Sequence, residues 1–201
     1  MLKTAVLVSG GGTNLQAIID SKQRGEMPSV ELALVLSSNR SAFALTRAEN
    51  AGIPSAVVRK RKNESEEEYG LRLIKTLNEY GIELIALAGF LTILPENIVK
   101  KYDHRIINIH PSLIPAFCGK GYYGLKVHEE ALKRGVKISG ATVHFVNEIP
   151  DGGDIIAQKA VEVLPGDTPE VLQKRIMVQA EWKLLPAALE QTAANLLKEK
   201  E

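Results

Sequence analysis

Short apolar segments alternate with amphipathic segments along most of this chain, and that alternation restricts the possible folds more than any other feature. The apolar runs are typical of buried strands, and the segments between them have helical spacing. The expected strands cover residues 4–8, 30–38, 54–58, 83–88 and 105–109, and the expected helices begin at Asn14 or cover residues 41–51, 66–80 and 94–102. Such alternation predicts an α/β fold with a mostly parallel, doubly wound sheet.

The pattern changes after Pro115. A stretch rich in glycine and aromatic residues precedes a helix that ends near Arg134, and two strand-like runs follow at 138–146 and 154–164. Two strands with no helix between them predict an antiparallel edge on the sheet. A long helix should close the chain from about residue 169 to 198, and Pro186 is a candidate break within it.

Length and charge narrow the classes of protein. A chain of 201 residues that is 45% hydrophobic suits one sizeable core, so we expect a single domain over residues 1–201. The formal net charge of +1 provides no field that would attract nucleic acid or an anionic membrane. No secretion signal and no apolar stretch of ~20 residues is present, which predicts a cytoplasmic location. Cys118 is the only cysteine, which excludes an internal disulfide and a cysteine-based metal cluster.

A pair of polar side chains marks the carboxyl end of the strand at 105–109. Asn108 and His110 point to the same side of that strand, and Pro111 ends it. The tips of strands in an open α/β sheet are where ligands bind, although a polar pair there can also be a solvated strand end. His110 would form a base-and-orienter pair with Asp151, which lies in a glycine-rich turn, if the fold brings them together.

A second candidate site is the glycine run that begins after Ser9, between the first strand and the first helix. Its backbone N–H groups lie at a positive helix end and suit a phosphate monoester, and Thr13 and Asn14 add side-chain donors. A plain tight turn is the alternative. The run is not a P-loop, because no Gly-Lys-Ser/Thr follows. Binding of NADP is a rival reading, since Arg40 would meet a 2′-phosphate, and a non-catalytic nucleotide-binding module is a third.

The remaining histidines give weaker signals. We expect His104 at the surface and His128, beside two glutamates, on a solvated helix face. His144 lies in an apolar strand and fits a hydrogen-bonded packing role as well as a ligand contact. Three ligands at metal spacing are missing from the sequence, which argues against a zinc site.

Several of these segments together resemble the folate-dependent formyltransferases. Residues 107–115, Ile-Asn-Ile-His-Pro-Ser-Leu-Ile-Pro, resemble the family signature, and Asp151-Gly-Gly resembles its partner motif. Residues 9–17 are similar to the phosphate loop of the purine-pathway members of the family. Further matches are Ala88-Gly-Phe, Ala141 to Val146 and Gly166-Asp-Thr, so the ordered set covers nearly the whole chain.

The resemblance implies a single Rossmann-like formyltransferase domain. Its phosphate-binding half would cover about 1–100, its folate and catalytic half about 85–165, and its C-terminal helix about 169–198. The implied reaction moves a formyl group from 10-formyltetrahydrofolate to the amine of glycinamide ribonucleotide, giving formylglycinamide ribonucleotide and tetrahydrofolate in purine biosynthesis. We expect small-molecule substrates, no metal, and a monomer or homodimer. The alternatives are a formyltransferase for another amine and an NADP-dependent oxidoreductase.

The resemblance also implies site residues. The catalytic residues would be Asn108, His110 and Asp151, with the Asp151 carboxylate raising the pKa of His110. The substrate would be bound by Gly12, Thr13, Asn14 and Glu181. The pterin would be bound by Leu91, Thr92, Ile93, Leu94, Asn108, Asn147, Glu148, Ile149, Pro150 and Asp151.

Three departures from the family pattern stand out. Some relatives have an arginine for the folate tail aligned near Glu66 and another basic residue aligned with Thr92, and neither is basic here. We hypothesise that one residue of the run 59–62, Arg-Lys-Arg-Lys, substitutes. The stretch 117–123 looks like an insertion, with no role assigned. One extra residue lies upstream of Glu181.

Overall fold

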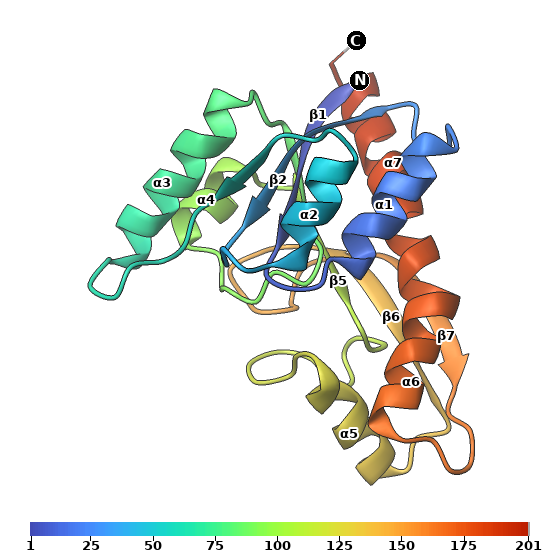
Figure 1. Cartoon of the computed structure of the whole chain (residues 1–201). Helices are drawn as coiled ribbons and strands as arrows, with labels where there is room; N and C mark the ends of the chain where they lie inside the picture. The colour runs from blue at the N-terminus through green and yellow to red at the C-terminus, as the bar shows by residue number, and fades with distance from the viewer. Residues whose placement is uncertain (201) are drawn as a thin grey trace.

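The computed structural model describes residues 1–200 and contains a seven-stranded sheet in the order β3-β2-β1-β4-β5-β6-β7 (Figure 1). Neighbours from β3 through β5 pair in parallel, whereas β6 is antiparallel to both β5 and β7. The predicted doubly wound sheet with an antiparallel edge is therefore confirmed. The strands are β1 (Leu2–Val8), β2 (Val30–Ser37), β3 (Ser55–Val57), β4 (Leu84–Leu87), β5 (Ile106–His110), β6 (Ile138–Phe145) and β7 (Ile155–Glu162).

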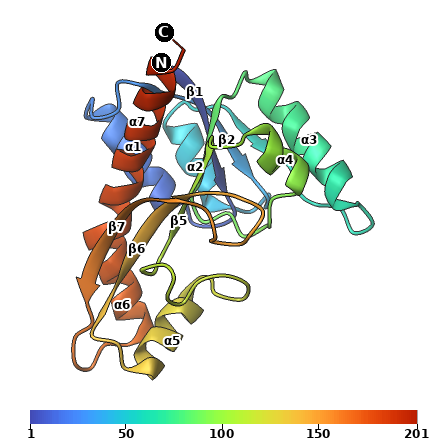
Figure 2. The ribbon, with the colours of Figure 1, turned by 180° about the vertical axis from the view of Figure 1, so that it is seen from behind.

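Helices cover both faces of the sheet, as Figures 1 and 2 show from opposite sides. One face carries α1 (Thr13–Gln23), α2 (Phe43–Asn50) and α7 (Trp182–Lys198), and the other carries α3 (Glu66–Glu79) and α4 (Glu96–Lys101). Strand β1 contributes to both cores, because Val6 and Val8 pack in one cluster and Ala5 and Leu7 in the other. This burial on both faces explains why the central strands are continuous apolar runs.

Two shorter helices, α5 (Leu125–Arg134) and α6 (Pro169–Ile176), pack against each other beside the antiparallel edge. The local sequence determines where α6 begins: the Thr168 side chain caps the helix, and Pro169 occupies its first turn. Helix α4 begins two residues later than expected, at Glu96. Leu94 precedes Pro95, and a residue before proline disfavours helical backbone.

The C-terminal helix is interrupted, but the predicted break at Pro186 was wrong. Pro186 lies inside α7, whereas the irregular segment is a π-helical turn, η1 (Met177–Glu181). A π turn accommodates an extra residue within a helix. This turn ends on Glu181, a predicted site residue, and lies where the resemblance implies one extra residue.

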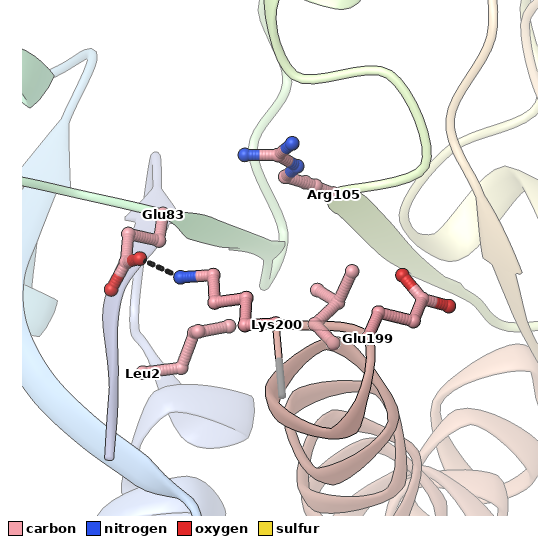
Figure 3. A pocket seen from close by; sticks show the side chains of 6 residues that line it. Leu2, Glu83, Arg105, Glu199 and Lys200 are labelled. Atoms are coloured by element: carbon pink, nitrogen blue, oxygen red, sulfur yellow. Dashed lines mark hydrogen bonds and ion pairs between the residues drawn. The ribbon is translucent and has the colours of Figure 1, made fainter.

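A shallow pocket of about 160 Å³ lies at the amino ends of the central strands (Figure 3). Glu83 and Lys200 form an ion pair across it, and Arg105 lies on its other side. Ligands of open α/β sheets bind at the opposite, carboxyl ends of the strands. Among residues 1–200, no helix is long and apolar enough to cross a bilayer.

The antiparallel edge depends on a close approach at Gly140. A Cβ atom there would lie 2.1 Å from the Lys159 carbonyl oxygen, whereas one at Gly166 would meet nothing within 4 Å. We predict that Gly140→Ala lowers the free energy of unfolding by at least ~2 kcal/mol more than Gly166→Ala, in which only the positive φ is strained. Urea unfolding of the two variants measures the difference, and equal losses would contradict the packing described.

Candidate active site

The polar residues gather where the parallel part of the sheet meets its antiparallel edge. His110 is the last residue of β5, and the antiparallel register places Asn108 directly opposite His144 on β6. His110 and His144 are 4% and 1% exposed. These imidazoles therefore lie within the sheet edge, not at a solvated strand end.

Asn108, His144 and Asp151 are in mutual contact. The Asn108 amide Nδ2 lies 3.1 Å from His144 Nε2 and 3.5 Å from Asp151 Oδ1. His144 Nδ1 lies 2.7 Å from the Phe145 carbonyl oxygen, which can only accept a hydrogen bond. In neutral His144 the proton is therefore on Nδ1, and Nε2 accepts a hydrogen bond from the Asn108 amide. Of the two roles considered for His144, the structure shows the hydrogen-bonded one: its ring orients the Asn108 side chain.

His110 meets Asp151 through one ring nitrogen and a loop carbonyl through the other. Its Nδ1 lies 3.5 Å from Asp151 Oδ2, and its Nε2 lies 2.9 Å from the Phe117 carbonyl oxygen. Burial lowers the pKa of His110 below its ordinary value, although Asp151 and the Phe117 carbonyl act in the opposite direction. The expected pair is present, but the expectation of a raised His110 pKa was wrong because desolvation of the imidazolium outweighs the carboxylate.

Asp151 is held in a backbone conformation that few residues adopt. Its φ is +55°, and its Oδ2 accepts a 2.8 Å hydrogen bond from the Gly119 amide. Burial alone would raise the Asp151 pKa, yet contacts with His144, His110 and Gly119 bring it below its ordinary value. A Cβ atom at Gly153 would lie 1.9 Å from the Phe145 carbonyl oxygen. Glycine there lets the turn that carries Asp151 come down onto β6.

The stretch 117–123, for which the sequence suggested no role, contacts two of the candidate catalytic side chains, through the carbonyl of Phe117 and the amide of Gly119. The segment before it is fixed by Thr142, whose hydroxyl donates to the Ser112 carbonyl and accepts from the Ile114 amide. Sequence reasoning missed these contacts. The one available signal was the position of Thr142, two residues before His144 on the same face of β6.

His128 was placed wrongly on a solvated face. It is fully buried on α5, and neither ring nitrogen has a hydrogen-bond partner among the described residues. Burial, with a smaller effect of His110, lowers the His128 pKa to about 4. The neighbouring glutamates misled the prediction, because His128 belongs with Val127 and Ala131 to the buried residues of α5.

The residues expected around the pterin line one pocket of about 150 Å³. One wall follows β4 and contains Phe90 and the segment 91–94, and the other is the segment 147–150. Asn108, His144 and Asp151 also line this pocket. The Leu91 amide donates to Ser9 Oγ at 2.9 Å, which joins this pocket to the start of the glycine run.

The glycine run and Glu181 also come together. Asn14 Nδ2 donates a 2.7 Å hydrogen bond to Glu181, and these residues are 9% and 6% exposed. Burial raises the pKa of the Glu181 carboxyl, and the bond from Asn14 offsets part of that effect. Asn14 Oδ1 has no partner within the described chain. Gly12 has a φ of +70°, and a Cβ there would lie 2.6 Å from Ala44 Cβ, so only glycine fits.

The proposed substitutes for the folate-tail arginine lie outside the pocket lining. Lys60 forms an ion pair with Glu66, close to which the resemblance implies an arginine in some relatives. Arg72, which sequence reasoning did not consider, pairs with Glu64 and donates to the Arg59 carbonyl. The hypothesis for residues 59–62 therefore stays a prediction, and Lys60 is the one residue of the four for which an ion pair with Glu66 is present.

Known proteins resemble this chain in sequence and in structure. It is 42% identical over 193 residues to the trifunctional purine biosynthetic protein adenosine-3 of Homo sapiens, an alignment covering 96% of this chain and 18% of that protein. It is 42% identical over 178 residues to the chloroplastic phosphoribosylglycinamide formyltransferase of Arabidopsis thaliana, covering 87% and 60%. The crystal structure of glycinamide ribonucleotide transformylase 1 from Symbiobacterium toebii superposes with a TM-score of 0.90 at 39% identity, covering 97% and 89%.

The chain thus spans about a fifth of the human relative and three-fifths of the plant one. Its fold is that of the solved transformylase over nearly the full described length. Residues 2–189 match the formyl transferase family, and the chain belongs to that family.

Proposed function

We propose that this protein transfers the formyl group of 10-formyltetrahydrofolate to the amine of glycinamide ribonucleotide. One observation carries the proposal: Asn108 and Asp151 line the pocket expected for the pterin, and His110 Nδ1 lies 3.5 Å from Asp151 Oδ2. The glycine run, linked to that pocket through Ser9, would hold the phosphate end of the second substrate. The names of the plant relative and of the solved transformylase support the choice of acceptor.

In this proposal, the amine attacks the formyl carbon and negative charge develops on the formyl oxygen. Asn108 and His110 supply donors to that oxygen, which requires their present partners, His144 and the Phe117 carbonyl, to give way. The attacking amine loses its proton to Asp151, through water, and N10 of the folate gains one from the imidazolium form of His110 as the C–N bond breaks. Asp151 then passes its proton to His110, which restores both groups. A His110 pKa below the ordinary value makes the imidazolium a readier acid for the protonation of N10.

Two alternatives carry over from the sequence. A formyltransferase for another amine would share the Asn108 and Asp151 cluster, but the glycine run favours a phosphorylated acceptor. An oxidoreductase that uses NADP would rely on Arg40, and it gives no role to the cluster at His110. The absence of a metal from the reaction, the monomeric or dimeric state and the cytoplasmic location stay predictions.

A single assay separates these functions. Purified protein is mixed with 10-formyltetrahydrofolate and glycinamide ribonucleotide, and tetrahydrofolate formation is followed alongside NADPH oxidation. We expect formyl transfer without NADPH turnover. NADPH oxidation without transfer would support the oxidoreductase instead.

Replacing either proposed donor should slow chemistry more than binding. We predict that Asn108→Ala and His110→Ala each lower kcat roughly 10²-fold or more, with a smaller change in folate affinity, because the donors act on charge present mainly in the transition state. Steady-state kinetics and folate titration measure the two effects. His104→Ala, an exposed histidine just before β5, is the control. Wild-type turnover in either donor variant would refute the assignment.

We expect the Glu181 carboxylate to lower the stability of the fold and to strengthen substrate binding. Its folded-state pKa is raised, so ionisation of the buried carboxyl destabilises the fold as pH rises above ~4.5. We predict that Glu181→Gln, which keeps an acceptor for Asn14, raises the urea midpoint at pH 8 and raises KM for glycinamide ribonucleotide about 10-fold, with the folate KM unchanged. Glu199→Gln, at the exposed end of α7, is the control. A lower urea midpoint at pH 8 would contradict the buried-charge account.

A further inference from the structure

A cavity of about 360 Å³ runs along the solvent side of α1, and most of its lining residues have no role in the site described above. Thr13, Gln16 and Arg47 line it near the glycine run, and Asp20, Arg24 and Trp182 line it further along the helix. It therefore reaches the first turn of α1, where the proposed phosphate site begins. None of the expected site residues other than Thr13 lines this cavity.

Arg47 is fixed beside the glycine run by neutral partners. Its Nε donates to the Gly11 carbonyl at 2.8 Å, its Nη1 donates to Gln16 Oε1 at 2.9 Å, and its guanidinium lies 5.0 Å from the centre of the Phe43 ring. A guanidinium has five N–H groups, so three stay available. Within residues 1–200, no carboxylate lies within ion-pair distance of Arg47. Its charge is held in place and is not neutralised.

The glycine run beside it presents donors only. The carbonyl of Gly10 accepts from the Ala44 amide, that of Gly11 from Arg47, and that of Gly12 from the Gln16 amide. The described chain provides no acceptor for the amides of Gly11, Gly12 and Thr13. Helices α2 and α1 thus bind the loop carbonyls while the N–H groups stay free, and the positive end of α1 adds to the attraction for an anion.

The other cations of the cavity differ from Arg47. Arg24 is bound to Glu26 by two hydrogen bonds of 2.8 Å, so its charge is already paired. Lys183 lines the cavity from an exposed position on α7 and has no recorded contact that fixes it. A fixed and unpaired guanidinium beside a loop that offers only donors is suited to a dianionic phosphate.

We propose that Arg47 binds the substrate phosphate at the Thr13 end of this cavity, supplying the full positive charge that the backbone amides lack. The inference rests on the proposed function and adds the residue that makes the site specific for a phosphorylated acceptor. Because Arg47 also anchors Gly11, the loss of its side chain acts on both charge and loop shape. A test must separate these two contributions.

The test compares Arg47→Gln and Arg47→Lys with Arg24→Gln, a cation of the same cavity already paired to Glu26. Each variant is assayed with glycinamide ribonucleotide and with the riboside that lacks the phosphate. We expect Arg47→Gln to raise KM for the ribonucleotide 10-fold or more, with kcat, the folate KM and kcat/KM for the riboside nearly unchanged. Arg47→Lys should recover part of the loss, and Arg24→Gln should behave as wild type.

Equal losses for ribonucleotide and riboside would show that Arg47 only shapes the loop, and an unchanged KM would place the phosphate elsewhere; either result overturns the inference. Binding of inorganic phosphate, followed by ³¹P NMR, provides a second readout that needs no activity. We expect wild type to bind phosphate and Arg47→Gln to bind it at least 10-fold more weakly while unfolding at the same temperature. If the wild type does not formylate the ribonucleotide, the proposed function is wrong. Equal phosphate affinity of the wild type and Arg47→Gln would overturn the role of Arg47, whatever the activity.

Discussion

The Asp151 carboxylate is the contact on which the arrangement of the site depends. Its two oxygens meet side chains from β5 and β6 and the Gly119 amide, so three segments distant in sequence converge on one group. A carboxylate can accept several hydrogen bonds at once, and contacts with His144, His110 and the Gly119 amide bring the Asp151 pKa below its ordinary value despite burial. The fold brings these segments together because β5 pairs in parallel with β4 and antiparallel with β6.

This change from parallel to antiparallel pairing also explains how the site relates to the rest of the molecule. The parallel strands end at the glycine run and the Leu91 segment, and the antiparallel β6 lays His144 against Asn108. The proposed phosphate-binding and folate-binding parts therefore lie beside each other at the carboxyl ends of the parallel strands, joined by the hydrogen bond from Leu91 to Ser9. Helix α2 contributes through the Ala44 amide and the Arg47 side chain, which bind the carbonyls of Gly10 and Gly11.

Local patterns were enough to predict most of the fold, and the resemblance to the formyltransferases grouped Asn108, His110 and Asp151, which the structure brings into contact. Alternation of apolar and amphipathic segments indicated the parallel strands, and the adjacent strand-like runs indicated the antiparallel edge. Features that depend on contacts between distant segments could not be predicted from the sequence. The burial of His128, the π turn before Glu181 and the lowered pKa of His110 each follow from packing that no local pattern encodes.

The coupling of Asp151 to His110 is the central claim, and an NMR titration of the His110 ring tests it directly. In the wild type the His110 pKa should lie below ~6.5, because burial outweighs the carboxylate. In Asp151→Asn it should fall further, since the nearest group favouring the imidazolium loses its charge, while Asp154→Asn, an exposed neighbour, should leave it unchanged. A His110 pKa that is the same in wild type and Asp151→Asn, or higher in the variant, would contradict the account.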